Sequence, residues 1–156
     1  MNRTFICMAL ALGCSGAIAQ AVSAPALPAI YNEQADARAE LNTALRKADA
    51  QHKQVLVVFG ANWCKDCRDL AGKMAGGTLA PYVAKQYVVT KVDVGRFDKN
   101  TDLAAQMGVP LKKGIPAVAL LSRDGQVIKA TGAGELADAR NMGDDAVLKV
   151  FEGLGH

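Results

Sequence analysis

Histidines and cysteines are scarce in this chain, whose 156 residues include two of the former and four of the latter. A secreted domain held together by structural disulfides carries more cysteines than this. A zinc site built on one cysteine pair needs two further ligands, and only His52 and His156 remain to supply them, so we predict no metal site. The formal net charge of +3 is small. It implies neither nucleic acid nor an anionic membrane as a partner.

Residues 1–19 have the pattern of a secretory signal peptide. Arg3 gives a basic start, residues 5–13 form a short apolar core, and residues 17–19 read Ala-Ile-Ala, the small-x-small pattern that signal peptidase prefers. The apolar run is too short for a transmembrane helix. We therefore expect export to the periplasm. Lipidation of Cys14, which would anchor the chain as a lipoprotein, is the alternative.

Cleavage after Ala19 would leave about 137 residues, the size of one ordinary domain. Residues 20–30, rich in alanine and proline, are expected to be a short linker, and residues 31–156 a single domain. The mature chain would keep only two cysteines, Cys64 and Cys67. In an oxidising compartment these two can pair only with each other or with a partner.

The two cysteines belong to the run Trp-Cys-Lys-Asp-Cys at residues 63–67. This run follows the apolar stretch 55–59, which predicts a strand covered on both faces, and it opens a predicted helix. A helix N-terminus favours a thiolate, because its dipole and free N–H groups stabilise negative charge. Only the thiolate attacks disulfides. We therefore predict that Cys64 is the nucleophile of a redox-active dithiol and that Cys67 is its resolving thiol.

Hydrophobic periodicity divides the rest of the chain into alternating helices and strands. The turn signal Arg123-Asp124-Gly125 predicts a hairpin between the last two strands. The predicted helices are 33–53, 64–74, 78–85, 100–107 and 144–154, and the predicted strands are 55–59, 87–94, 117–121 and 126–131.

The chain resembles the thioredoxin family over nearly the whole of residues 31–156. Three motifs carry the resemblance: the Trp-Cys-x-x-Cys run, the Gly-Ile-Pro segment 114–116 before a predicted strand, and the Asp-Gly pair 124–125 after that strand. The resemblance implies an α/β, thioredoxin-like fold, with a mixed central β-sheet and helices on both faces.

The resemblance also implies the surroundings of the dithiol. In the family the proline of the second motif is cis and faces the cysteines, so Pro116 would be cis and lie against Cys64. Ile115 would offer its backbone N–H and C=O groups to an extended substrate segment. Lys91 could match the lysine that family members place near the active site. Trp63 can cover the dithiol, although an aromatic residue beside a buried strand is often just part of the core.

Several features depart from the family pattern. Val58 stands where members usually carry a buried acid that helps to deprotonate the resolving cysteine. Asp66 is a candidate replacement, although we expect it to be exposed. Lys65 should favour the Cys64 thiolate and Asp66 should oppose it, so that their effects partly cancel. The segment that leads to Pro116, residues 108–113, is a few residues longer than is usual in the family. This longer lead-in lies beside the expected substrate groove.

These features predict a periplasmic thiol–disulfide oxidoreductase that works as a disulfide reductase through a mixed disulfide. Ile115 matches thioredoxin-type reductants rather than the Val or Thr common in oxidases and isomerases. The alternatives are a disulfide oxidase or isomerase, or a thioredoxin-fold binding module without turnover. We expect protein disulfides as substrates, no cofactor and no nucleic acid. By resemblance, a membrane thiol carrier would donate electrons, and we expect a monomer.

Overall fold

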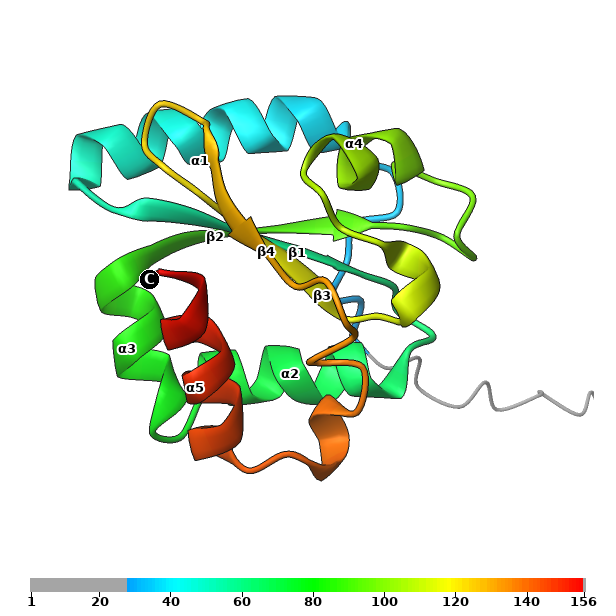
Figure 1. Cartoon of the computed structure of the whole chain (residues 1–156). Coiled ribbons are helices and arrows are strands. Elements are labelled where there is room, and N and C mark those ends of the chain that lie inside the picture. Colours follow the sequence, from blue (N-terminus) through cyan, green and yellow to red (C-terminus); the bar gives the residue numbers. More distant parts are fainter. Residues whose placement is uncertain (1–27, 156) are drawn as a thin grey trace, which may run out of the picture.

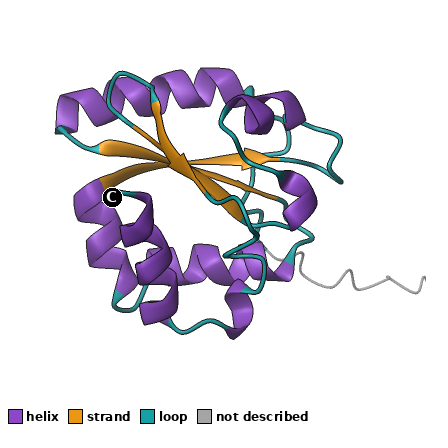
Figure 2. Cartoon of the chain, in the orientation of Figure 1, coloured by secondary structure: helices purple, strands orange, loops and turns teal. Residues whose placement is uncertain are grey.

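The computed structural model describes residues 28–155. Its centre is a four-stranded sheet in the order β2-β1-β3-β4 (Figures 1 and 2). The strands are β1 (Gln54–Gly60), β2 (Tyr87–Asp93), β3 (Ala117–Leu121) and β4 (Val127–Ala130). β1 is parallel to β2 and antiparallel to β3, which is antiparallel to β4. The sheet is therefore mixed, as predicted.

Helices cover both faces of the sheet (Figure 1). On one face lie α1 (Ala37–Gln51) and α4 (Thr101–Gln106), and on the other α2 (Lys65–Ala75), α3 (Leu79–Gln86) and α5 (Asp144–Leu154). Two short 3₁₀ helices, η1 (Leu111–Lys113) and η2 (Ala139–Asn141), complete the elements. The thioredoxin-like α/β fold predicted from the sequence is confirmed.

Strand β1 lies at the centre of two apolar cores because its side chains alternate between the faces. Val55, Val57 and Phe59 pack into the core beneath α1 and α4. Leu56 and Val58 pack into the core formed with α2, α3 and α5. The uninterrupted apolar run in the sequence is thus explained by a strand covered on both sides. The strand ends at Gly60, directly before the cysteine run.

Two helix starts differ from the sequence expectation. The first helix begins at Ala37 rather than at residue 33, because the Asp36 side chain accepts hydrogen bonds from the N–H groups of Arg38 and Ala39 and caps the helix there. α3 begins at Leu79 rather than at residue 78, and Thr78 takes the N-cap position without a capping bond from its side chain. Its hydroxyl instead donates to Asp144 Oδ2 at 3.1 Å.

The expected signal peptide, the Cys14 alternative and most of the expected linker lie outside the described residues. Within residues 28–155, none of the helices has both the length and the apolar character needed to cross a membrane. In the same range no three His, Cys, Asp or Glu side chains gather into a group able to hold a metal ion.

Candidate active site

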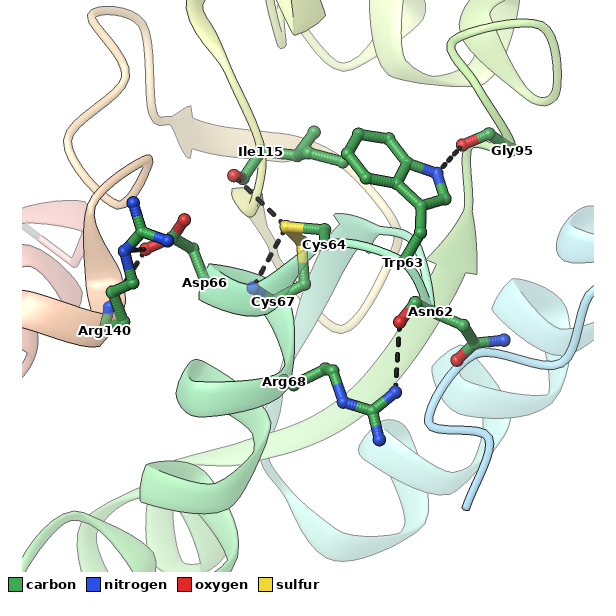
Figure 3. Close-up of a disulfide and its surroundings, with 9 residues drawn as sticks. All are labelled: Asn62, Trp63, Cys64, Asp66, Cys67, Arg68, Gly95, Ile115 and Arg140. Atoms are coloured by element: carbon green, nitrogen blue, oxygen red, sulfur yellow. Dashed lines mark hydrogen bonds and ion pairs between the residues drawn. A yellow bond between two sulfur atoms is a disulfide. The ribbon is translucent and has the colours of Figure 1, made fainter. Parts of the chain in front are cut away.

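Cys64 occupies the N-cap position of α2, where the chain turns out of β1. Its sulfur accepts a hydrogen bond from the backbone N–H of Cys67 at 3.1 Å, the place usually taken by a capping oxygen (Figure 3). The two cysteines form a disulfide, with their Cα atoms 5.3 Å apart. In the reduced protein this position would stabilise a Cys64 thiolate through the helix dipole and the free N–H groups.

The two sulfur atoms differ in access. Cys64 is 5% exposed, whereas Cys67 is 0% exposed and packs beneath it. A cavity of about 460 Å³ opens over the first cysteine and is lined by Cys64 but not by Cys67. Of the two sulfur atoms, an incoming disulfide can therefore reach only that of Cys64. Cys67 is placed to react only with the sulfur of Cys64.

The segment before β3 faces the dithiol. The Ile115–Pro116 peptide bond is cis, as the family resemblance implied. The carbonyl oxygen of Ile115 lies 3.6 Å from Cys64 Sγ (Figure 3), within reach of a thiol proton on that sulfur in the reduced protein. Ile115 and Pro116 are both buried, and Ile115 lines the cavity over Cys64.

Trp63 forms a wall of this cavity and is 47% exposed, so it is not a core residue. Its indole Nε1 donates to the carbonyl oxygen of Gly95 at 2.8 Å (Figure 3). The ring meets Phe97 edge-on, with the centroids 6.0 Å apart, and the Arg96 guanidinium lies 5.5 Å from the indole centroid. Arg96 and Phe97, in the loop after β2, were not among the residues predicted from the sequence.

We expected Asp66 to be exposed, and this expectation is wrong. Its side chain is only 14% exposed and contacts η2. Asp66 Oδ1 accepts a hydrogen bond from the backbone N–H of Arg140 at 3.1 Å and lies 3.6 Å from Arg140 Nε (Figure 3). The arginine thus offsets the negative charge of Asp66, which weakens the opposition of Asp66 to a Cys64 thiolate. Lys65 is exposed at the rim of the cavity.

Lys91 lies on β2, in register with Val58 of β1. It lines a cavity beside α1 rather than the cavity over Cys64, and burial lowers the pKa of its ammonium group. Val58 is buried, so the central strand presents no carboxylate beneath the dithiol at this position. The structure therefore does not bring Lys91 into the wall around Cys64.

Asn62, one residue before Trp63, binds the segment that precedes α1. Asn62 Oδ1 accepts from the backbone N–H groups of Ile30 and Tyr31 at 2.8 and 2.9 Å. Asn62 Nδ2 donates to the carbonyl oxygen of Tyr31 and to Glu33 Oε1. The amide thereby fixes Tyr31, a residue missed by the sequence analysis, beside the loop that carries the cysteines.

The longer lead-in to Pro116 forms a second, more apolar cavity next to the first. Its volume is about 610 Å³, and it is lined by α4 and by the segment from Val109 to Gly114. Phe97 lines both cavities. The additional residues, predicted to lie beside the substrate groove, therefore extend the surface that begins at Trp63.

A helix-capping cysteine, a buried partner cysteine and a cis-proline in the facing segment, on this fold, define a thiol–disulfide oxidoreductase. A family model described as thioredoxin-like matches residues 36–122. The chain is 41% identical to a solved disulphide isomerase from Xylella fastidiosa Temecula1, with a TM-score of 0.78 over 84% of this chain and 100% of that one. The protein belongs to the thioredoxin-like family.

More distant structures share the fold. A thioredoxin from Thermus thermophilus is 19% identical, with a TM-score of 0.52 over 73% of this chain and 82% of that one. The oxidised C-terminal domain of DsbD from Neisseria meningitidis is also 19% identical, with a TM-score of 0.51 over 74% of this chain and 94% of that one. No curated protein sequence matches the chain.

Proposed function

We propose that this oxidoreductase is a periplasmic disulfide reductase that uses Cys64 and Cys67 in sequence. The observation that carries the proposal is the placement of the two sulfur atoms. Cys64 caps α2 and faces an open cavity, and Cys67 is fully buried behind it. This arrangement gives one thiol access to a substrate and the other access only to the first thiol.

The proposed reaction has two exchange steps. The Cys64 thiolate attacks one sulfur of a substrate disulfide, forms a mixed disulfide and releases the other substrate sulfur as a thiolate. Cys67 then loses its proton and attacks Cys64 Sγ. The Cys64–Cys67 disulfide forms and the second substrate thiolate leaves. Two electrons pass from the protein dithiol to the substrate, and a membrane thiol carrier would return the protein to its reduced form.

The walls of the cavity would hold the substrate around the reacting sulfurs. We assign the backbone of Ile115, beside the cis Pro116, to an extended substrate segment, and the exposed face of Trp63 to its apolar side chains. Lys65 would favour the Cys64 thiolate, and the contact between Asp66 and Arg140 would keep the aspartate charge from opposing it. Lys91 would act at most indirectly, because it lines a different cavity.

A disulfide isomerase is the second candidate, favoured by the 41% identical relative that carries this description. Both activities begin with the reduced Cys64 thiolate and the same mixed disulfide. They differ in the next step, since an isomerase lets a substrate thiol displace Cys64, whereas a reductase uses Cys67. Ile115, the residue type of thioredoxin-type reductants, and the position of Cys67 directly beneath Cys64 support the reductase.

The sequence supports a proposal for the cellular setting. We propose that residues 1–19 direct export, that residues 20–30 are a linker, and that the working domain spans residues 31–156. The signal-like pattern of the first residues supports this division. A dithiol that works as a reductant in an oxidising compartment needs a dedicated electron source, which is the reason for proposing a thiol carrier as partner.

Cys67→Ser is expected to trap the mixed disulfide, because serine cannot displace the substrate sulfur from Cys64. Reduced variant protein is mixed with an excess of a peptide dimer joined by one intermolecular disulfide, so that the released peptide thiol diffuses away, and the intact mass is recorded. We expect one peptide to be added covalently and to be released by dithiothreitol. The wild-type protein, as the matched control, should accumulate reduced peptide and carry no adduct. An unmodified variant would contradict the two-step reaction.

A further inference from the structure

The resolving step requires a proton acceptor for Cys67, and the expected positions do not supply one. Cys67 is fully buried, so bulk water does not contact its sulfur. The central strand has the buried residue Val58 where thioredoxin-family members usually carry a buried acidic residue. Asp66, the candidate replacement, is bound to Arg140. The group that takes the proton from Cys67 must therefore come from elsewhere in the fold.

The Tyr31 hydroxyl lies in the same small space as the sulfur of Cys67. A Cβ atom placed on Gly60 would overlap the Tyr31 hydroxyl and would lie 3.0 Å from Cys67 Sγ. Tyr31 is 1% exposed, and its hydroxyl makes no hydrogen bond among the described residues. A buried hydroxyl without a partner costs free energy, so such a group calls for an explanation. Because Gly60 has no side chain, the Tyr31 hydroxyl can occupy this space.

Asp93 lies on the same side of the sheet as this space. It pairs in register with Gly60 in the parallel strands β1 and β2, so the two residues share a face. Asp93 is buried, and its Oδ2 atom makes no hydrogen bond within the described part of the chain, although Lys99 Nζ lies 3.7 Å away. Burial, and then the charge of Asp93, raise the pKa of Tyr31 above its ordinary value. The carboxylate therefore acts electrostatically on the hydroxyl.

A polar cavity connects Asp93 with the surface. Its volume is about 280 Å³, and its lining includes Glu33, Glu40, Lys91 and Lys99. Burial raises the pKa of Asp93, and the charge of Glu33 adds to this rise, while the Gly95 N–H group and Lys99 oppose it. The net result is a carboxylate with increased proton affinity that can exchange protons with solvent through the cavity.

We propose that Tyr31 and Asp93 form the proton route that deprotonates Cys67 during the resolving step. In the oxidised structure the Tyr31 hydroxyl bonds neither group. In the mixed disulfide, where Cys67 is a free thiol, the hydroxyl would accept the Cys67 proton as it passes its own proton to the Asp93 carboxylate. The Cys67 thiolate then attacks Cys64 Sγ, and the substrate sulfur leaves with the electron pair of the broken bond. Asp93 returns the proton to solvent through the polar cavity. This inference rests on the two-step reaction proposed above.

The two exchange steps can be timed separately with 5,5′-dithiobis(2-nitrobenzoate). Attack by Cys64 releases one coloured thiolate, and attack by Cys67 on the resulting mixed disulfide releases the second. We expect Tyr31→Phe and Asp93→Asn each to slow the second release about a hundredfold at pH 7, the usual size of a general-base contribution. The first release should stay at the wild-type rate. The difference in the second rate between variant and wild type should shrink at higher pH, because Cys67 then loses its proton without help from Tyr31 and Asp93.

Asp49→Asn is the control, because Asp49 is an exposed carboxylate of α1 that lines neither the polar cavity nor the cavity over Cys64. It should leave both releases unchanged. The proposal is overturned if both Tyr31→Phe and Asp93→Asn resolve at the wild-type rate, or if either slows the two releases equally, as a structural defect would. Tyr31→Phe keeps the ring and the backbone bonds to Asn62, so it decides the matter if Asp93→Asn fails to fold. Failure of the wild-type protein to release a second equivalent would instead refute the proposed two-step function.

Discussion

Cys64→Ser is expected to reduce the rate of disulfide reduction to that of the reaction without protein. A serine hydroxyl is not ionised at neutral pH and does not attack disulfides, whereas the thiolate is the reactive form of cysteine. Cys67 cannot take over, because it is fully buried and does not line the cavity that a substrate would enter. The measurement is the initial rate of reduction of a disulfide peptide that carries a fluorophore and a quencher, with dithiothreitol as electron source.

Asp69→Asn provides a control in the same helix, since Asp69 is exposed and lines neither cavity beside Trp63. This variant should reduce the peptide at the wild-type rate. Retention of peptide reduction by Cys64→Ser would contradict the assignment of the nucleophile. If the variant loses peptide reduction but keeps its full biological function, the binding module without turnover becomes the better account.

Gly60→Ala is expected to destabilise the oxidised protein by about 1–3 kcal/mol, the usual cost of overpacking a core. The new methyl group would overlap the Tyr31 hydroxyl and the ring carbon that bears it, and it would lie 3.0 Å from Cys67 Sγ. Tyr31 cannot simply turn away, because it is buried and its backbone is bound on both sides by Asn62. Urea unfolding of the oxidised protein measures the change.

Gly72→Ala is the matched control for this substitution. Gly72 is exposed in the interior of α2, and no atom outside the helix backbone lies within 4 Å of the added carbon. Alanine there should stabilise the protein by about 0.5–1 kcal/mol, because glycine loses more backbone freedom in a helix. If Gly60→Ala proved as stable as the wild type, Tyr31 would not pack over Gly60, and the proton route through its hydroxyl would lose its basis.

Local sequence patterns were sufficient to predict the strands and the dithiol. The apolar run before the cysteines encodes a strand covered on both faces, and β1 spans Gln54–Gly60, one residue longer at each end than predicted. The two-residue spacing between Cys64 and Cys67 places them in one helical turn, where they form the disulfide. The cis bond at Pro116 followed from the family resemblance and not from the composition of the segment.

The surroundings of the dithiol depend on contacts between distant segments, which no local pattern encodes. Asp66 meets Arg140, 74 residues further along the chain, so its burial could not be inferred from its place in an exposed helical turn. Asn62 binds Tyr31, 31 residues earlier, although both residues look like ordinary loop positions in the sequence. Asp93 gains its importance only because the parallel pairing of β1 and β2 sets it beside Gly60.

The reduction potential of the Cys64–Cys67 couple tests the reductase assignment most directly. The mature protein is equilibrated with glutathione redox buffers, and the oxidised fraction is followed by Trp63 fluorescence and thiol alkylation. We expect a value below about −230 mV, in the range of thioredoxin-like reductants. A value above about −160 mV would contradict the account and indicate an oxidant or isomerase, and the absence of any reversible couple would favour the binding module.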